Sequence, residues 1–91
     1  MDNANLKIGS VVLSKCGRDK GRYFLVCKII SPEYVMLVDG HVRKLDKPKL
    51  KKAKHISLTD KCVDNIAAKF ENNKQVFDSE IFSALKTYNI K

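Results

Sequence analysis

The stretch IGSVVLSKCGRDKGRYFLVCKII, residues 8–30, holds two apolar segments separated by a short charged loop. Valine content and partial alternation predict a β-strand over residues 8–16, and the apolar segment 22–30 predicts a second. Glycines bracket the loop at residues 17–21, where they can take positive φ angles or let a partner's backbone approach closely. The stretch therefore predicts a β-hairpin with a basic loop.

The second strand of this hairpin is apolar on both faces. Successive side chains of a strand point to opposite sides, which divides its apolar residues into Tyr23, Leu25, Cys27 and Ile29 on one face and Phe24, Val26 and Ile30 on the other. One face can fill the interior of a small barrel. The other face needs a cover, which the C-terminal segment can provide.

Turn signals divide the next part of the chain into further short strands. Ser31-Pro32-Glu33 ends the second strand, and residues 34–38 predict a third. Asp39-Gly40 is a strong hairpin signal, which predicts that residues 41–45 return as a fourth strand. Residues 56–58 can close the sheet as a short fifth strand. This spacing favours a small five-stranded β-barrel over a β-α-β fold.

After residue 59 the apolar pattern changes to a helical period. Two apolar stripes predict helices over residues 60–71 and 78–89: Val63, Ile66, Ala67 and Phe70, then Ile81, Phe82, Leu85 and Tyr88. Thr59 and Asp78 are the expected N-caps, with Leu58 packing on Val63 and Phe77 packing on Phe82.

We expect this helical hairpin to pack on the outward face of the second strand, with Phe70 and Phe82 in the interface. Residues 1–59 would then form the barrel with its basic connector, and residues 60–91 a helical cover in the same folded unit.

The positive charge of the chain is confined to its N-terminal part. The whole chain has a net charge of +8, and residues 1–59 account for all of it, with 13 basic against 5 acidic side chains. Residues 60–91 hold 5 of each and are neutral. Charge gathered in one region creates a local potential that attracts a polyanion. Nucleic acid is therefore the leading partner.

Other features argue against membrane, metal and secreted classes. Apolar runs such as residues 34–38 fall far short of the roughly 20 residues of a membrane span, and Met-Asp-Asn-Ala-Asn is unlike the start of a signal peptide. Cys16, Cys27 and Cys62 show no Cys-x-x-Cys spacing, so reduced thiols are expected. Zinc would need more ligands at short spacing than Cys27, His41 and His55 provide. We expect a cytoplasmic protein without cofactor, metal or membrane contact.

Two basic clusters are the candidate nucleic-acid-binding sites. Arginine can bind phosphate bidentately and lysine acts as a mobile point charge, while counterion release makes a lysine run a general phosphate anchor. The alternatives are an ordinary hairpin loop, in which Asp19 caps the turn, and a solubilising linker. The loop cluster consists of Lys15, Arg18, Lys20 and Arg22, and the strip of Arg43, Lys44, Lys47, Lys49, Lys51, Lys52 and Lys54, with His55 beside it.

A resemblance to a known family runs through these same residues. Ile8-Gly9-Ser10-Val11-Val12, followed by Gly17-Arg18-Asp19-Lys20-Gly21-Arg22 and Phe24-Leu25-Val26, resembles the KOW motif of several ribosomal proteins and of the NusG family. Leu37-Val38-Asp39-Gly40, followed by Val42-Arg43-Lys44, is similar to the fourteenth large-subunit ribosomal protein of eukaryotes and archaea and its short bacterial relatives. The resemblance covers about residues 6–60. It implies an SH3-like barrel and RNA binding, often on ribosomal RNA.

The predicted function is non-catalytic RNA binding associated with ribosomal RNA or the translation machinery. Paired carboxylates, a Ser-His-Asp arrangement and a nucleotide motif are missing from the sequence, and Cys16 has no identifiable base, so an enzyme with a small-molecule substrate is not expected. Tyr23, Tyr34 and Phe24 could stack on a base but fit the core better. The rival interpretation is an adaptor that docks on ribosomal or transcription proteins.

Overall fold

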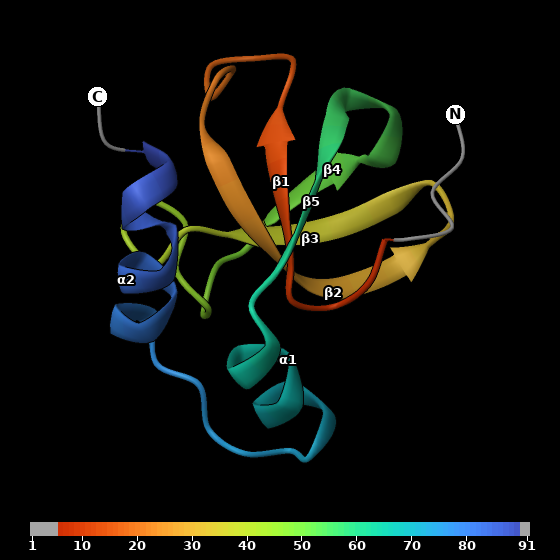
Figure 1. Cartoon of the computed structure of the whole chain (residues 1–91). Helices are drawn as coiled ribbons and strands as arrows, with labels where there is room; N and C mark the ends of the chain where they lie inside the picture. Colours follow the sequence, from red (N-terminus) through yellow and green to blue (C-terminus); the bar gives the residue numbers. More distant parts are fainter. Residues whose placement is uncertain (1–5, 90–91) are drawn as a thin grey trace.

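A computed structural model describes residues 6–89, and the N-terminal stretch interpreted above as unlike a signal peptide lies outside them. The described chain forms one β-sheet followed by two helices (Figure 1). In chain order the elements are β1 (Ser10–Ser14), β2 (Tyr23–Ser31), β3 (Tyr34–Val38), β4 (Lys49–Lys52), the 3-10 turn η1 (Ala53–His55), β5 (Ile56–Cys62), α1 (Asp64–Glu71) and α2 (Asp78–Asn89).

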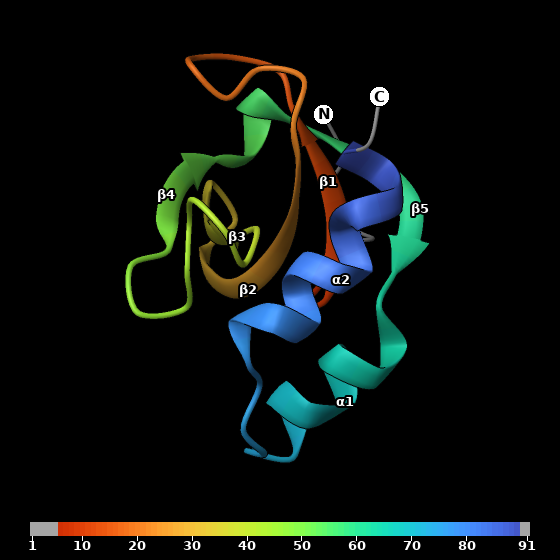
Figure 2. The same cartoon turned by 90° about the vertical axis from the view of Figure 1, so that its left-hand side faces the viewer.

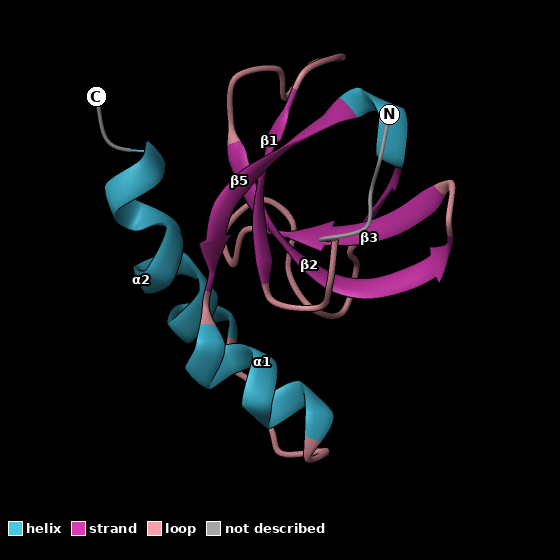
Figure 3. Ribbon diagram, turned by 45° about the vertical axis from the view of Figure 1, so that its right-hand side comes forward, coloured by secondary structure: helices cyan, strands magenta, loops and turns pink. Residues whose placement is uncertain are grey.

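The five strands form an antiparallel sheet in the order β4-β3-β2-β1-β5. The predicted hairpin is present, with Val11 opposite Leu25 and Leu13 opposite Tyr23. β4 and β5 lie at opposite edges, yet only η1 separates them in the chain, so the sheet curls strongly (Figure 3). The sheet is not closed, but its shape is compatible with an SH3-like barrel. The expected class, mainly β with two C-terminal helices, is confirmed.

The alternation of β2 places its first half in two separate cores, as predicted, but the prediction is wrong for Ile29 and Ile30, which are exposed near the end of the strand. The inner core fills the curled sheet and contains Val12, Phe24, Val26, Val35, Leu37 and Ile56. The outer core lies between the sheet and the helices and contains Val11, Leu25, Val38, Ile66, Val76, Ile81 and Leu85. Figure 2 shows α2 lying against the sheet and α1 below it, after the end of β5, and both helices contribute side chains to the outer core. Burial of these side chains is the main stabilising contribution to the fold.

The prediction of a fourth strand over residues 41–45 is wrong. The strand that pairs with β3 is β4, with Leu37 opposite Lys49 and Tyr34 opposite Lys52. Residues 39–48 form a long loop in place of a two-residue turn. The cause lies in Asp39, which is buried and accepts hydrogen bonds from the backbone N–H groups of His41 and Arg43, at 2.9 and 2.7 Å. These bonds fold the chain back on itself before it can extend as a strand.

The N-caps and the fifth strand also differ from the prediction. β5 continues to Cys62, and Thr59 lies within it, where its Oγ1 donates to the carbonyl of Val11 at 2.7 Å. α1 therefore begins only at Asp64. α2 spans residues 78–89 as predicted, but the carboxylate of Asp78 accepts from Leu45 N–H, at 2.7 Å, instead of capping its own helix. Glu80 accepts from Phe77 N–H at 3.0 Å, which is the bond that the glutamate of a capping box makes to the residue before the helix.

Phe82 is not in the interface with β2. Its exposed fraction is 43%, whereas Ile81 and Leu85 are buried in the outer core, and Phe70 packs against that core half-buried. Ile81 and Leu85 are four residues apart and share a helix face, and Phe82, one residue further on, points away from that face. The expected Phe77–Phe82 packing is not supported either, because Phe77 is 54% exposed.

Candidate nucleic-acid interface

The candidate interface lies where the β1–β2 loop, residues 15–22, meets the β3–β4 loop, residues 39–48. The β1–β2 loop is closed by backbone hydrogen bonds from Gly21 N to Ser14 O and from Arg22 N to Asp19 O, at 2.9 and 3.0 Å. Gly17 and Gly21 have φ angles of +86° and +90°, as the glycine bracket predicted. The loop is thus held in a defined shape that can present its arginines in fixed directions.

Asp19 joins this loop to β4. Its carboxylate accepts from Ser14 Oγ at 2.8 Å and forms salt bridges with Lys51 and Lys49 at 3.1 and 3.3 Å. Lys51 Nζ also donates to the carbonyl of Cys16 at 2.7 Å. Burial alone would raise the pKa of Asp19, but the hydrogen bonds from Ser14, Lys51 and Lys49 outweigh it, and the net pKa is lowered. Asp19 anchors the loop instead of only capping a turn.

This anchor changes the role predicted for the lysine strip. Lys51, predicted as part of the RNA-binding strip, is buried, with 8% of its side chain exposed, so the strip is interrupted at this residue. The reason is that residues 49–52 form a strand, in which alternate side chains point to opposite faces. Lys49 and Lys51 turn towards Asp19, while Leu50 and Lys52 are exposed to solvent.

Asp39 organises the second loop. Besides the two backbone donors of that loop, its carboxylate forms a salt bridge with Arg22 at 3.2 Å. The Asp39 side chain is 1% exposed and that of Arg22 is 44% exposed. The surface therefore presents the guanidinium and not the carboxylate, and the ion pair fixes the guanidinium between the two loops.

A pocket of about 260 Å³ opens between the loops. Phe24 and the exposed Val42 supply its apolar wall, and Asp19 and Asp39 also line it, with their charges already paired. The cationic side chains that line it are Arg18, Arg22, Arg43 and Lys49. Such a cluster of forked and point-charge donors around a small cavity is suited to phosphate groups.

The remaining predicted site residues do not line this pocket. The exposed ones among them are Lys15, Lys20, Lys44, Lys47, Lys52 and Lys54. His55 is half-buried in η1, and its carbonyl accepts from Lys15 N–H at 2.9 Å, so its observed contact is structural. Structure thus gathers four of the predicted cations at one pocket and leaves the other exposed cations outside it.

A second pocket, of about 240 Å³, adjoins the first and was missed by the sequence reasoning. It shares Arg22 and Asp39 with the first pocket, and the side chains that complete it come from α2: Phe82, Lys86 and Asn89. These three positions are spaced i, i+4, i+7 and therefore share one face of the helix. The spacing is visible in the sequence, but Phe82 fits the apolar stripe of α2 equally well, so the sequence alone does not single out this face.

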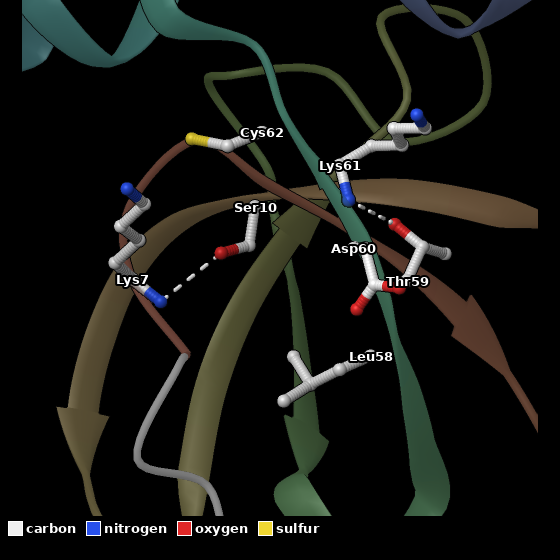
Figure 4. A pocket seen from close by; sticks show the side chains of 7 residues that line it. All are labelled: Lys7, Ser10, Leu58, Thr59, Asp60, Lys61 and Cys62. Atoms are coloured by element: carbon white, nitrogen blue, oxygen red, sulfur yellow. Dashed lines mark hydrogen bonds between the residues drawn. The ribbon is translucent and has the colours of Figure 1, made fainter.

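A third cavity, of about 400 Å³, lies beside β5 and holds Lys7, Ser10, Thr59, Asp60 and Cys62 among its lining residues (Figure 4). Burial raises the pKa of the Cys62 thiol, and the nearby Lys7 does not reverse this shift. The thiol therefore stays protonated at neutral pH, which disfavours nucleophilic chemistry there.

Comparisons with known proteins add no assignment to these features. They leave the following structural findings as they are: within residues 6–89 no helix is long and apolar enough to cross a membrane, and no three His, Cys, Asp or Glu side chains are grouped closely enough to hold a metal ion.

The chain has no match among known families or curated proteins: no protein-family model matches it, and no curated protein matches its sequence. The resemblance to KOW proteins consequently stays a prediction that rests on the residues quoted for it.

Proposed function

We propose that this protein is a non-catalytic RNA-binding protein of the KOW type that holds RNA phosphates in the pocket between its β1–β2 and β3–β4 loops. The observation that carries the proposal is the convergence of Arg18, Arg22, Arg43 and Lys49 on that pocket. These side chains come from three separate parts of the chain, and the salt-bridged carboxylates of Asp19 and Asp39 link those parts to one another.

The local charge balance supports an anionic ligand. Asp39 and Asp19 are each engaged in salt bridges, so they do not cancel the outward field of Arg18 and Arg43. Exposed lysines of the β3–β4 loop and of β4 extend the positive field beyond the pocket. A phosphate chain is an anion long enough to span the pocket and these lysines together.

RNA is favoured over duplex DNA by the shape of the site. The pocket is a small concavity between loops, and none of its lining residues belongs to a helix that could enter a major groove. Compact loops with cations suit irregular or single-stranded RNA, which is recognised through shape and phosphates. Ribosomal RNA or another RNA of the translation machinery is the context we propose.

Salt dependence of binding tests this function. With about four to six phosphates engaged, log K for a labelled ribosomal RNA hairpin should fall against log salt with a slope of about −3 to −5. Fluorescence anisotropy across a salt series gives the slope. A flat dependence, combined with a protein partner that survives RNase treatment in a pull-down, would favour the adaptor role instead.

The pocket and the outlying lysines should contribute differently. Arg18→Gln removes one charge from the pocket, and Lys54→Gln removes one charge from an exposed position outside it. We expect Arg18→Gln to change the ranking among several RNAs and Lys54→Gln to weaken all of them about equally. If both variants shift every RNA by the same factor, the pocket has no special role.

A further inference from the structure

The exposed aromatic side chain of α2 lies beside the phosphate pocket, in the part of the chain that carries no net charge. Phe82 is 43% exposed and lines the second pocket with Lys86 and Asn89. Its ring lies against that of His41, with centroids 5.6 Å apart and planes tilted by 47°. The outer core does not explain the position of Phe82, since Ile81 and Leu85 already supply the buried face of this helix.

The position of this aromatic pair is fixed from both sides. Gly40 has a φ of +77°, and a Cβ placed on it would come within 2.7 Å of Phe82 N, so the β3–β4 loop lies directly on the backbone of α2. Any side chain at residue 40 would push the loop away. His41, next in the chain, is also held by its N–H bond to Asp39.

The other end of the second pocket is equally well anchored. The Asn89 side chain accepts from Tyr23 N–H at 2.9 Å and donates to the Tyr23 carbonyl at 3.2 Å, which ties α2 to the start of β2. Tyr88 also packs on Tyr23, with ring centroids 5.4 Å apart. The wall formed by Phe82, Lys86 and Asn89 is therefore preorganised relative to Arg22.

We infer that this second pocket binds an unpaired nucleotide, whose base stacks on Phe82 and whose phosphate is held between Arg22 and Lys86. Arg22 lines both pockets, so the phosphate chain can pass from one to the other across it. Aromatic stacking accepts any base and requires that the base be unpaired. The inference rests on the proposed RNA binding and deepens it, because it makes the site selective for single-stranded over duplex RNA.

Matched variants test the stacking. Phe82→Leu removes the ring and keeps apolar bulk, and Phe77→Leu makes the same change at a second exposed phenylalanine outside both pockets. We expect Phe82→Leu to weaken binding of a short oligoadenylate about fivefold or more. Phe77→Leu should bind like the native protein. Thermal melting of both variants checks that the fold is intact.

A fluorescent variant reports the contact directly. The chain contains no tryptophan, so Phe82→Trp introduces a single indole at the site. Stacking predicts that its fluorescence is quenched by oligoadenylate, and that an abasic oligonucleotide with the same phosphates quenches it much less. Phe82→Trp should also retain binding that Phe82→Leu loses, because the aromatic face is restored.

The outcomes separate this inference from the proposed function. If Arg18→Gln weakens RNA binding while Phe82→Leu matches Phe77→Leu, the phosphate pocket stands and the stacking site is overturned. Equal affinity for duplex and single-stranded RNA would also overturn it. If the native protein binds no RNA in low salt, the proposed function fails, and the stacking site fails with it.

Discussion

At the scale of single residues, two aspartates inside basic loops determine the geometry of the candidate site. Asp19 accepts a hydrogen bond from Ser14 and forms salt bridges with Lys49 and Lys51. Asp39 accepts hydrogen bonds from the backbone of its own loop and forms a salt bridge with Arg22. A carboxylate is suited to this position because it can accept several charge-assisted hydrogen bonds at once. The acids reduce the net charge of the region, but they also hold its cations in fixed directions.

Asp19→Asn tests the anchor through pH. The pKa of Asp19 is lowered in the folded protein, so its stabilising contribution is present above the unfolded pKa, near pH 4, and is lost as the pH falls through the lower folded value. At pH 7 the variant should lose about 1.5–3 kcal/mol of unfolding free energy. Its stability should fall less steeply in acid than that of the native protein.

Asp46→Asn is the matched control for this change. It removes the same charge from an exposed residue of the β3–β4 loop, for which no salt bridge is found among residues 6–89. Thermal melting between pH 2.5 and 7 compares the three proteins. An Asp19→Asn profile parallel to the native one would show that Asp19 does not hold the loop through its charge.

At the scale of elements, α2 divides its side chains between two tasks. Ile81 and Leu85 face the outer core, and Phe82 and Lys86 face the second pocket. Asp78, at the start of the helix, binds Leu45 N–H and thereby fixes the β3–β4 loop. The helix consequently stabilises the sheet and shapes the candidate interface.

Two truncations of side chains should separate these tasks. Leu85→Ala opens a cavity at a residue that is 1% exposed and should cost about 2–5 kcal/mol of unfolding free energy. Phe82→Ala, at a residue 43% exposed, should cost less than half as much. Urea denaturation measures both. Equal losses would mean that Phe82 is buried in solution and could not stack on a base.

At the scale of the whole molecule, the net positive charge and the helices that cover the sheet come from different parts of the chain. All of the net charge lies in residues 1–59, and the helices of the neutral part bury the outer face of the sheet. Without them Val11, Leu25 and Val38 would be exposed together, as one apolar patch. We therefore expect both parts to be needed for a stable unit with a basic surface.

Removal of the helices tests this dependence. A fragment that ends at Val63 keeps all five strands but loses Ile66, Ile81 and Leu85 from the outer core. We expect it to aggregate or to melt far below the full chain, as measured by light scattering and circular dichroism. A soluble fragment with unchanged melting and unchanged RNA affinity would instead identify the helices as an independent arm.

Sequence by itself determined the features that depend on near neighbours in the chain. The hairpin over residues 8–30, the two apolar faces of the first half of β2 and the helix over residues 78–89 follow from local period and glycine placement, and each is present in the structure. The regional charge was equally readable, since it needs only counting. The glycine-bracketed loop that contains Arg18 was equally readable, because glycine placement is a local signal, whereas Arg22 precedes β2 and was predicted as its first residue.

Tertiary structure decided the features whose partners lie far along the chain. β4 forms at Lys49–Lys52 because buried Asp39 folds the preceding residues into a loop that docks on α2. Lys51 is buried because its ammonium group forms a salt bridge with Asp19, 32 residues earlier in the chain. Phe82 is exposed because Ile81 and Leu85 already fill the outer core. In each case local propensity allowed several outcomes, and a distant hydrogen-bond or packing partner selected one of them.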